Sequence, residues 1–239
     1  MSLINSASLY GLIFGLIGTS IGGFIGSYFN FKSNKILSFI LELSAGLMTS
    51  IICFDLIPES ILNANIFITI VGILIGALFM YLINLIISKK TNNFSHLFKT
   101  GIIIFIGLSL HNLPEGLAIG SGFISSQTLG LSLCLAIALH DIPEGMSISI
   151  PLVSSGFSKT KAFLFATFSG LTTGIGAFLG ATISNINETF ISFSLSIAAG
   201  TMLFIISHEL IYESKKIYIG SFPTFGFILG VILGLFIFI

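Results

Sequence analysis

The chain has 239 residues, of which 54% are hydrophobic and 8% are charged, and its formal net charge is zero. A soluble domain carries about 25% charged residues, so the composition excludes a sizeable soluble domain. It predicts one transmembrane domain over residues 1–239. Without a basic surface, nothing indicates a nucleic-acid partner. The two cysteines lie in apolar runs and are expected to be small buried hydrophobes.

Apolar runs that could cross a bilayer recur along the whole chain. A transmembrane helix needs about 20 such residues. We predict spans at residues 7–29, 36–57, 66–87, 100–121, 128–151, 160–183, 190–212 and 218–239. No basic segment precedes the first run, which therefore indicates a span and not a cleaved signal. The expected fold is an all-α integral membrane protein with about eight helices.

The basic residues follow every second predicted span. They are Lys32, Lys35, Lys89, Lys90, Lys99, Lys159, Lys161, Lys215 and Lys216. With eight spans, all of them fall on one side of the membrane, and the positive-inside rule makes that side cytoplasmic. We therefore expect a multi-pass protein of the inner (cytoplasmic) membrane with both termini outside the cytoplasm.

The chain also repeats itself at one constant offset of 154 residues. The matching residues are Ala45, Gly46 and Met48 with Ala199, Gly200 and Met202, and Leu56, Ile57, Glu59 and Ser60 with Leu210, Ile211, Glu213 and Ser214. The offset relates spans one to three to spans six to eight. Span one runs inward and span six outward, so the repeat is inverted. Such a repeat with a polar site on its central helices is typical of secondary transporters.

The fourth and fifth spans carry two closely similar motifs. HNLPEG occupies 111–116 and HDIPEG occupies 140–145, which relates span four to span five. Residues four apart share a helix face, so each motif presents a histidine and a glutamate together. The set His111, Glu115, His140 and Glu144 could converge as ligands of a divalent transition metal.

The prolines of these motifs predict kinks in the central helices. Pro114 and Pro143 each remove one helical hydrogen bond, and a membrane tolerates such a break where it is buried in protein or lines a polar cavity. A charged side chain at the bilayer centre costs about 2.5–3.5 kcal/mol. Each glutamate could simply pair with its own histidine, but the duplication of the whole motif favours a metal site.

Three further polar or sulfur-bearing residues could join this site. Asn112 and Asp141 follow the two histidines and could form an adjoining site or orient the first ligands; the sequence leaves both possibilities open. Met48 lies within span two. Its thioether is a soft metal ligand, although a methionine in an apolar helix is more often core packing.

Acidic residues near the ends of spans two and seven suggest a path for cations. Asp55 and Glu59 lie near the outer end of span two. Glu209 and Glu213, beside His208, lie near the inner end of span seven. They could attract cations at the mouth and draw them off at the exit, or they could be ordinary interfacial charges.

An alternating-access carrier fits these features best. A channel with the same ligands is one alternative, and a metal sensor is disfavoured because no output domain follows. An intramembrane zinc hydrolase would need an open coordination position, but no HExxH motif occurs, since Tyr212 stands four residues after His208. We therefore expect no enzyme and no cofactor. The transported substrate would be Zn²⁺ or another divalent metal such as iron, manganese or cadmium.

Five stretches together resemble the ZIP family of divalent metal transporters, in its bacterial branch. They are the paired motifs, SAGLMTSIICFDLIPES in span two, SGLTTGIGAFLG in span six and AAGTMLFIISHELIYES in span seven. The resemblance covers nearly the whole chain. It implies eight spans in an inverted three-plus-two-plus-three arrangement, a homodimer, and uptake of metal into the cytoplasm.

The resemblance also assigns individual residues. It implies a main metal site at His111, Glu115, His140 and Glu144 with Met48, and a second site at Asn112 and Asp141 bridged by the two glutamates. Bacterial members often complete that second site with Glu-Pro in span six, where this chain has Thr173 and Gly174. Without that carboxylate we expect the second site to be weak, transient or absent.

Overall fold

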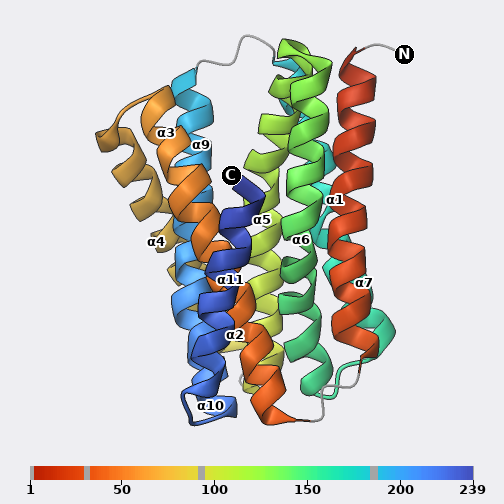
Figure 1. Cartoon of the computed structure of the whole chain (residues 1–239), viewed down its shortest axis with the longest axis vertical. Coiled ribbons are helices and arrows are strands. Elements are labelled where there is room, and N and C mark those ends of the chain that lie inside the picture. The colour runs from red at the N-terminus through yellow and green to blue at the C-terminus, as the bar shows by residue number, and fades with distance from the viewer. Residues whose placement is uncertain (1–2, 30–32, 91–94, 184–187, 239) are drawn as a thin grey trace.

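In a computed structural model, the chain is described over residues 3–29, 33–90, 95–183 and 188–238, which contain helices and no strands (Figure 1). The α-helices are α1 (Leu3–Tyr28), α2 (Asn34–Ile51), α3 (Ile57–Asn63), α4 (Ile66–Lys90), α5 (His96–Ser125), α6 (Gln127–Ser154), α7 (Lys159–Ser169), α8 (Leu171–Thr182), α9 (Glu188–Phe204), α10 (Ile211–Ile217) and α11 (Phe222–Phe238). Two π-helical turns, η1 (Ile52–Leu56) and η2 (Ile205–Leu210), join α2 to α3 and α9 to α10.

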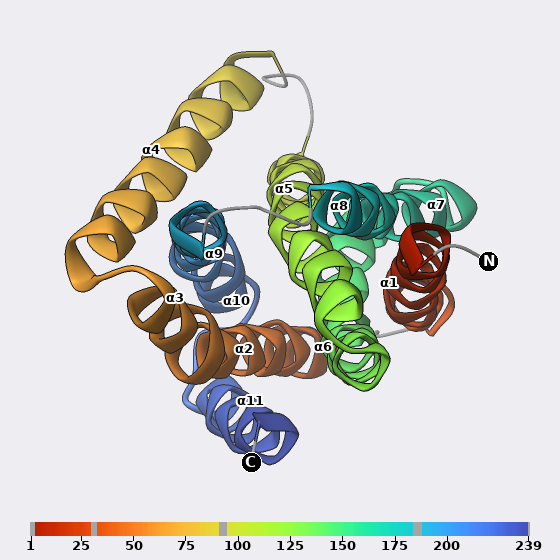
Figure 2. The same ribbon diagram turned by 90° about the horizontal axis from the view of Figure 1, so that it is seen from above.

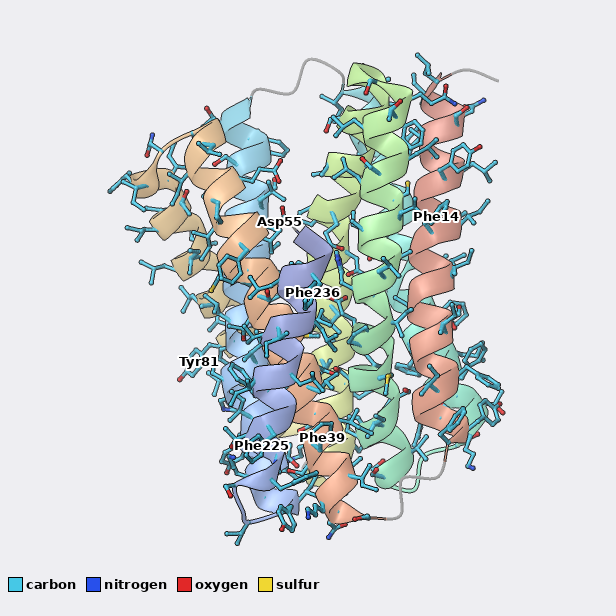
Figure 3. All side chains as sticks on the ribbon, viewed as in Figure 1. Phe14, Phe39, Asp55, Tyr81, Phe225 and Phe236 are labelled. Carbon is cyan, nitrogen blue, oxygen red and sulfur yellow. The ribbon has the colours of Figure 1, made fainter. Side chains whose placement is uncertain are left out.

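These elements confirm the predicted all-α membrane fold. Seven continuous helical segments of the described chain are long and apolar enough to cross a membrane, and α11 adds a shorter apolar helix of 17 residues. Large apolar side chains cover the outside, as Tyr81, Phe225 and Phe236 illustrate (Figure 3). Phe236 is 80% exposed and Phe225 is 64% exposed. In lipid such exposure is favourable, whereas in water it would not be.

The helices form two bundles that stand side by side (Figure 2). The first, called here the motif bundle, contains α1, α5, α6, α7 and α8. The second bundle contains α2, α3, α4, α9, α10 and α11. The bundles meet where α5 and α6 contact α2, α9 and η2. The two motif helices therefore lie at the boundary between the bundles.

The inverted repeat is visible in the helix–helix contacts, because the main contacts in one half of the chain have equivalents between the corresponding helices of the other half. In the second bundle α2 packs on α11 while α9 packs on α4, and in the motif bundle α1 packs on α6 while α8 packs on α5. The hydroxyl groups of Ser60 and Ser192 lie 3.0 Å apart, and those of Ser38 and Ser214 lie 2.6 Å apart. The offset of 154 converts one pair into the other, since 38 + 154 = 192 and 60 + 154 = 214. The same relation links η1 to η2.

The last glycine of each motif is required for close helix contact. A Cβ atom at Gly116 would collide with the carbonyl oxygen of Thr173 on α8, and one at Gly145 would collide with that of Thr19 on α1. These contacts are again related by the repeat, because 19 + 154 = 173. Small residues let backbones approach in this way in membrane bundles, and here they fix the motif helices against their neighbours.

Irregular helical backbone occurs at two places away from the motif prolines. Helices α5 and α6 run without interruption past Pro114 and Pro143. The irregular backbone lies instead in η1 and η2, which carry Asp55 and Glu209. Single π-helical turns within α-helices often mark functional sites. No local sequence pattern predicts these turns, since a π-turn depends on packing more than on residue type.

One end of the molecule is rich in lysine. The starts of α2, α5 and α7 and the end of α10 meet there, and the contact between Lys215 Nζ and Glu42 Oε1 (2.8 Å) joins two of them. We call this the lysine end, and the other the opposite end, where α1 begins (Figure 1). Lys32 lies outside the described residues.

Candidate metal centre

The two histidines of the motifs point at one carboxylate oxygen. Nε2 of His111 lies 2.8 Å from Oε1 of Glu115, and Nε2 of His140 lies 2.9 Å from the same atom. The contact from His140 is a hydrogen bond, whereas that from His111 lacks hydrogen-bond geometry. Glu144 Oε1 is 3.8 Å from His111 Nε2. All four side chains are at most 3% exposed, so they converge in the protein interior.

The carboxylates of this cluster have unused acceptor capacity. Oε2 of Glu115 and both oxygens of Asp141 and of Glu144 are buried and have no hydrogen-bond partner. Ligand atoms of Glu115, His140 and Asp141 lie within 4.8 Å of one another. Buried charge without compensation is strongly unfavourable. A divalent cation would provide that compensation, and the nitrogen and oxygen donors suit a transition metal.

Asn112 and Thr173 are two further buried residues with unpartnered side-chain oxygens. The Asn112 amide donates to the Ser169 carbonyl (3.2 Å), which leaves its Oδ1 without a partner. The Thr173 hydroxyl is also buried and unpartnered. Both positions therefore offer neutral oxygens, and Thr173 brings no negative charge. Gly174, the other predicted departure, packs on Leu12 of α1.

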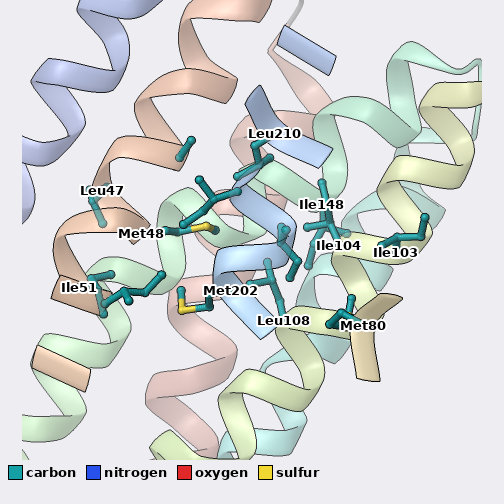
Figure 4. Packing of buried hydrophobic residues seen from close by; sticks show 14 of the residues in the cluster. Leu47, Met48, Ile51, Met80, Ile103, Ile104, Leu108, Ile148, Met202 and Leu210 are labelled. Carbon is teal, nitrogen blue, oxygen red and sulfur yellow. The ribbon is translucent and has the colours of Figure 1, made fainter. Parts of the chain in front are cut away.

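Met48 is fully buried in the hydrophobic cluster next to the site (Figure 4). Its repeat equivalent Met202 lies in the same cluster. Ser44, one helical turn before Met48 on α2, donates its hydroxyl to the Pro143 carbonyl (3.4 Å). This contact packs α2 against the second motif. The structure thus places Met48 on the helix that faces the motifs, within apolar surroundings.

A cavity of about 310 Å³ leads to this site from the opposite end. Glu115 and His140 line it together with Asp55 and Glu59. Figure 3 shows Asp55 on the side of the second bundle that faces the motif bundle. Asp55 and Glu59 are both partly exposed. The predicted access residues and two predicted ligands therefore share one open space.

Apolar side chains separate the site from the lysine end. On α5 they are Ile104 and Leu108, which precede the first motif, and on α6 Ile148 and Leu152, which follow the second motif; Ile205 of the second bundle belongs to the same cluster. Figure 4 shows most of them packed together. Each is buried, and ions do not cross a packed apolar layer. In this structure the cavity lies on the opposite-end side of the motifs, and buried apolar side chains lie on the lysine side of them along α5 and α6.

The predicted release residues form a second polar group beyond this apolar layer. Glu209 and Glu213 are each 2% exposed. Glu209 accepts a hydrogen bond from Thr100 (2.8 Å) and contacts His208 Nδ1 (3.0 Å). Glu213 contacts His96 Nδ1 (2.6 Å). Sequence reasoning missed the role of Thr100, because a threonine at the start of an apolar helix gives no distinctive signal.

The chain matches the family model described as ZIP Zinc transporter over residues 87–237. It is 30% identical to a zinc transporter ZupT of Clostridium perfringens, an alignment that covers 97% of this chain and 94% of the relative. It is 31% identical to a ZupT of Akkermansia muciniphila, with 91% of each chain covered. The zinc transporter GufA of Myxococcus xanthus is 37% identical over 138 residues, which cover 57% of this chain and 54% of that protein.

Proposed function

Because the chain belongs to the ZIP family of zinc transporters, we propose that it moves divalent transition metals, zinc first among them, across the cytoplasmic membrane by alternating access. Iron, manganese and cadmium suit the same donors. The metal is the transported substrate and not a cofactor. The named relatives are transporters, and the proposed activity is transport without catalysis.

One observation carries this proposal. A buried set of imidazoles and unpartnered carboxylates adjoins a cavity, which Glu115 and His140 line together with Asp55 and Glu59. The ligands are proposed to be His111, Glu115, His140 and Glu144. Two carboxylates neutralise a divalent ion, so the loaded site carries no net charge when both histidines are neutral. Met48 is proposed as a soft ligand that approaches from the second bundle.

The acidic residues on each side define the proposed path. Metal approaches past Asp55 and Glu59, which line the cavity together with the site. It leaves past His208, Glu209 and Glu213 once the apolar layer opens. Partly exposed carboxylates concentrate cations at a mouth through their summed field.

A second metal position beside the first is proposed to be weak. Asn112 and Asp141 would hold it, with Glu115 and Glu144 as bridges. Thr173 contributes a hydroxyl where a carboxylate would add a charged ligand. Two divalent metals bound next to each other need several shared carboxylates. The carboxylate missing at position 173 therefore lowers the affinity of the second metal position.

The membrane arrangement follows from the lysines. We place the lysine end in the cytoplasm, so both termini lie outside it and transport runs inward. All spans belong to one domain over residues 1–239. Relatives of this family are expected to pair, and we propose a homodimer in the bilayer.

The proposal is tested by ⁶⁵Zn uptake into proteoliposomes. The native chain should show saturable uptake, and Glu144→Gln and His111→Ala should each lose it because each removes a ligand. Ser109→Ala is the matched control, since the Ser109 hydroxyl only donates to the Phe105 carbonyl of its own helix (2.6 Å). Unchanged uptake in both ligand variants would mean that the motifs are structural. Uptake that does not saturate would favour a channel.

A further inference from the structure

Polar contacts join the two bundles at the lysine end. Thr100 Oγ1 donates to Glu209 Oε2 (2.8 Å), and His96 Nδ1 lies 2.6 Å from Glu213 Oε1. His96 and Thr100 lie one turn apart at the start of α5, in the motif bundle, so they share a face. Both glutamates belong to the second bundle, in η2 and α10. These contacts must break before the site can open toward the lysine end.

The inverted repeat identifies the corresponding positions at the opposite end. Asp55 corresponds to Glu209 and Glu59 to Glu213 by the offset of 154. The two motifs are related by an offset of 29, since 140 − 111 = 29, and Thr100 therefore corresponds to Leu129. When an inverted-repeat carrier changes state, the contacts at its two ends exchange roles. The opposite end would then close by bringing α6 toward Asp55.

That closed opposite end lacks the polar contact found here. Leu129 is 44% exposed and has no hydrogen-bonding group in its side chain. Ser132, one turn along α6, donates its hydroxyl to the Leu129 carbonyl (2.8 Å) and lines the cavity. A hydrogen bond to a carboxylate stabilises a structure more than one between neutral groups. The state closed at the lysine end is therefore expected to be more stable than the state closed at the opposite end.

We propose that Thr100, assisted by His96, is the residue that sets the resting state of the carrier. Its bond to Glu209, together with the contact between His96 and Glu213, forms an inner latch that keeps the lysine end shut. At the opposite end Leu129 occupies the position of Thr100 and offers Asp55 no donor. The unloaded carrier therefore rests with its metal site facing away from the lysine end. This inference rests on the proposed transport function but concerns the protein without metal.

The test uses single-cysteine reporters of each state. In a background with Cys53→Ser and Cys134→Ala, Ala136→Cys reports the cavity, which Ala136 lines. Ile104→Cys reports the apolar layer, where Ile104 is fully buried. A membrane-impermeant maleimide is applied to the cavity reporter in right-side-out vesicles and to the Ile104 reporter in inside-out vesicles. A chelator keeps metal absent throughout.

The variant Thr100→Val keeps the shape of the side chain and removes its donor. We expect labelling at position 104 to rise by up to about tenfold, the change in an equilibrium expected for one such hydrogen bond, while labelling at position 136 falls. Thr100→Ser retains the donor and should behave as the native chain. Leu129→Thr supplies the missing donor at the opposite end and should slow labelling at position 136.

The two reporters separate a latch from a purely structural role. Unchanged labelling at both positions in Thr100→Val would overturn the proposal, and so would a rise at both, which indicates general loosening. If Thr100→Val does not yield folded protein, the Leu129→Thr variant tests the proposal instead. The proposal then fails if position 136 in Leu129→Thr is labelled at the native rate. Because labelling needs no metal, normal uptake with unchanged labelling overturns only the latch. Absent uptake with the expected labelling shifts overturns only the transport function.

Discussion

Asp55 and Glu209 occupy equivalent places in the two halves of the chain, yet their surroundings are opposite. Asp55 is partly exposed and lines the cavity that reaches the site. Glu209 is 2% exposed and accepts a hydrogen bond from Thr100. Both sit on π-helical turns, 154 residues apart. One molecule thus displays an open and a closed version of the same element, as alternating access requires.

The acidic residues of the cavity should govern metal capture and leave the transport step unchanged. We expect Asp55→Asn combined with Glu59→Gln to raise the KM for zinc about tenfold at low salt, because a charged cleft concentrates cations. Vmax should differ from that of the native chain by less than about twofold, because all proposed metal ligands remain in place. Uptake kinetics at low and high ionic strength measure this. A fall in Vmax with unchanged KM would contradict an access role.

A carboxylate placed at position 173 should create the second metal position. Thr173 is buried and its hydroxyl has no partner, and Thr173→Asp adds charge at nearly constant size. We expect metal analysis of the purified protein to change from about one ion per chain to about two, as in carboxylate-bridged pairs. Thr173→Asn is the control and should stay at about one. Two equally occupied metals in the native chain, about 4–5 Å apart, would show that the hydroxyl suffices.

Transport should weaken as the medium becomes acidic. Metal binding requires neutral imidazoles at His111 and His140 and ionised carboxylates. Protons compete with the metal for these ligand atoms, so zinc uptake should fall as the medium is acidified from about pH 7.5 to about pH 5.5. Initial rates are to be measured with equal pH on both sides of the vesicle membrane. A flat profile would indicate that the histidines do not bind the metal.

Substitution of Met48 should change the preference among metals. Met48→Leu keeps an apolar side chain of similar volume, so packing in the cluster should survive. Loss of the thioether should lower cadmium uptake several-fold relative to manganese, because cadmium is the softer ion and manganese prefers oxygen. Competition uptake with both metals measures the ratio. An unchanged ratio would assign Met48 to packing alone.

The motif glycines should tolerate no added methyl group. In Gly116→Ala the new Cβ would meet the Thr173 carbonyl, which is backbone and cannot move aside. We expect a loss of about 1–3 kcal/mol, the usual cost of overpacking, seen as a lower melting temperature in detergent. Gly122→Ala on the same helix is the control, because its nearest neighbour is the end of the Leu133 side chain. Equal stability of both variants would contradict the tight contact.

The sequence by itself determined the class of the protein, its spans and its candidate ligands. Apolar runs of bilayer length can satisfy their backbone in lipid only as helices, and the structure confirms this fold. The family model and the ZupT relatives confirm the predicted ZIP membership. Side chains four apart on a helix must share a face, so the pairing of His111 with Glu115 followed from spacing. The roles of the individual site residues stay predictions.

Only the tertiary structure decided which state the protein adopts and which residues hold it. The cavity at Asp55, the apolar layer above the lysine end and the bond from Thr100 to Glu209 all join segments far apart in the chain. Equivalent halves have nearly equivalent sequence patterns, and patterns along one helix cannot tell which half is open. That choice depends on contacts between the bundles, where single side chains such as Thr100 and Leu129 differ.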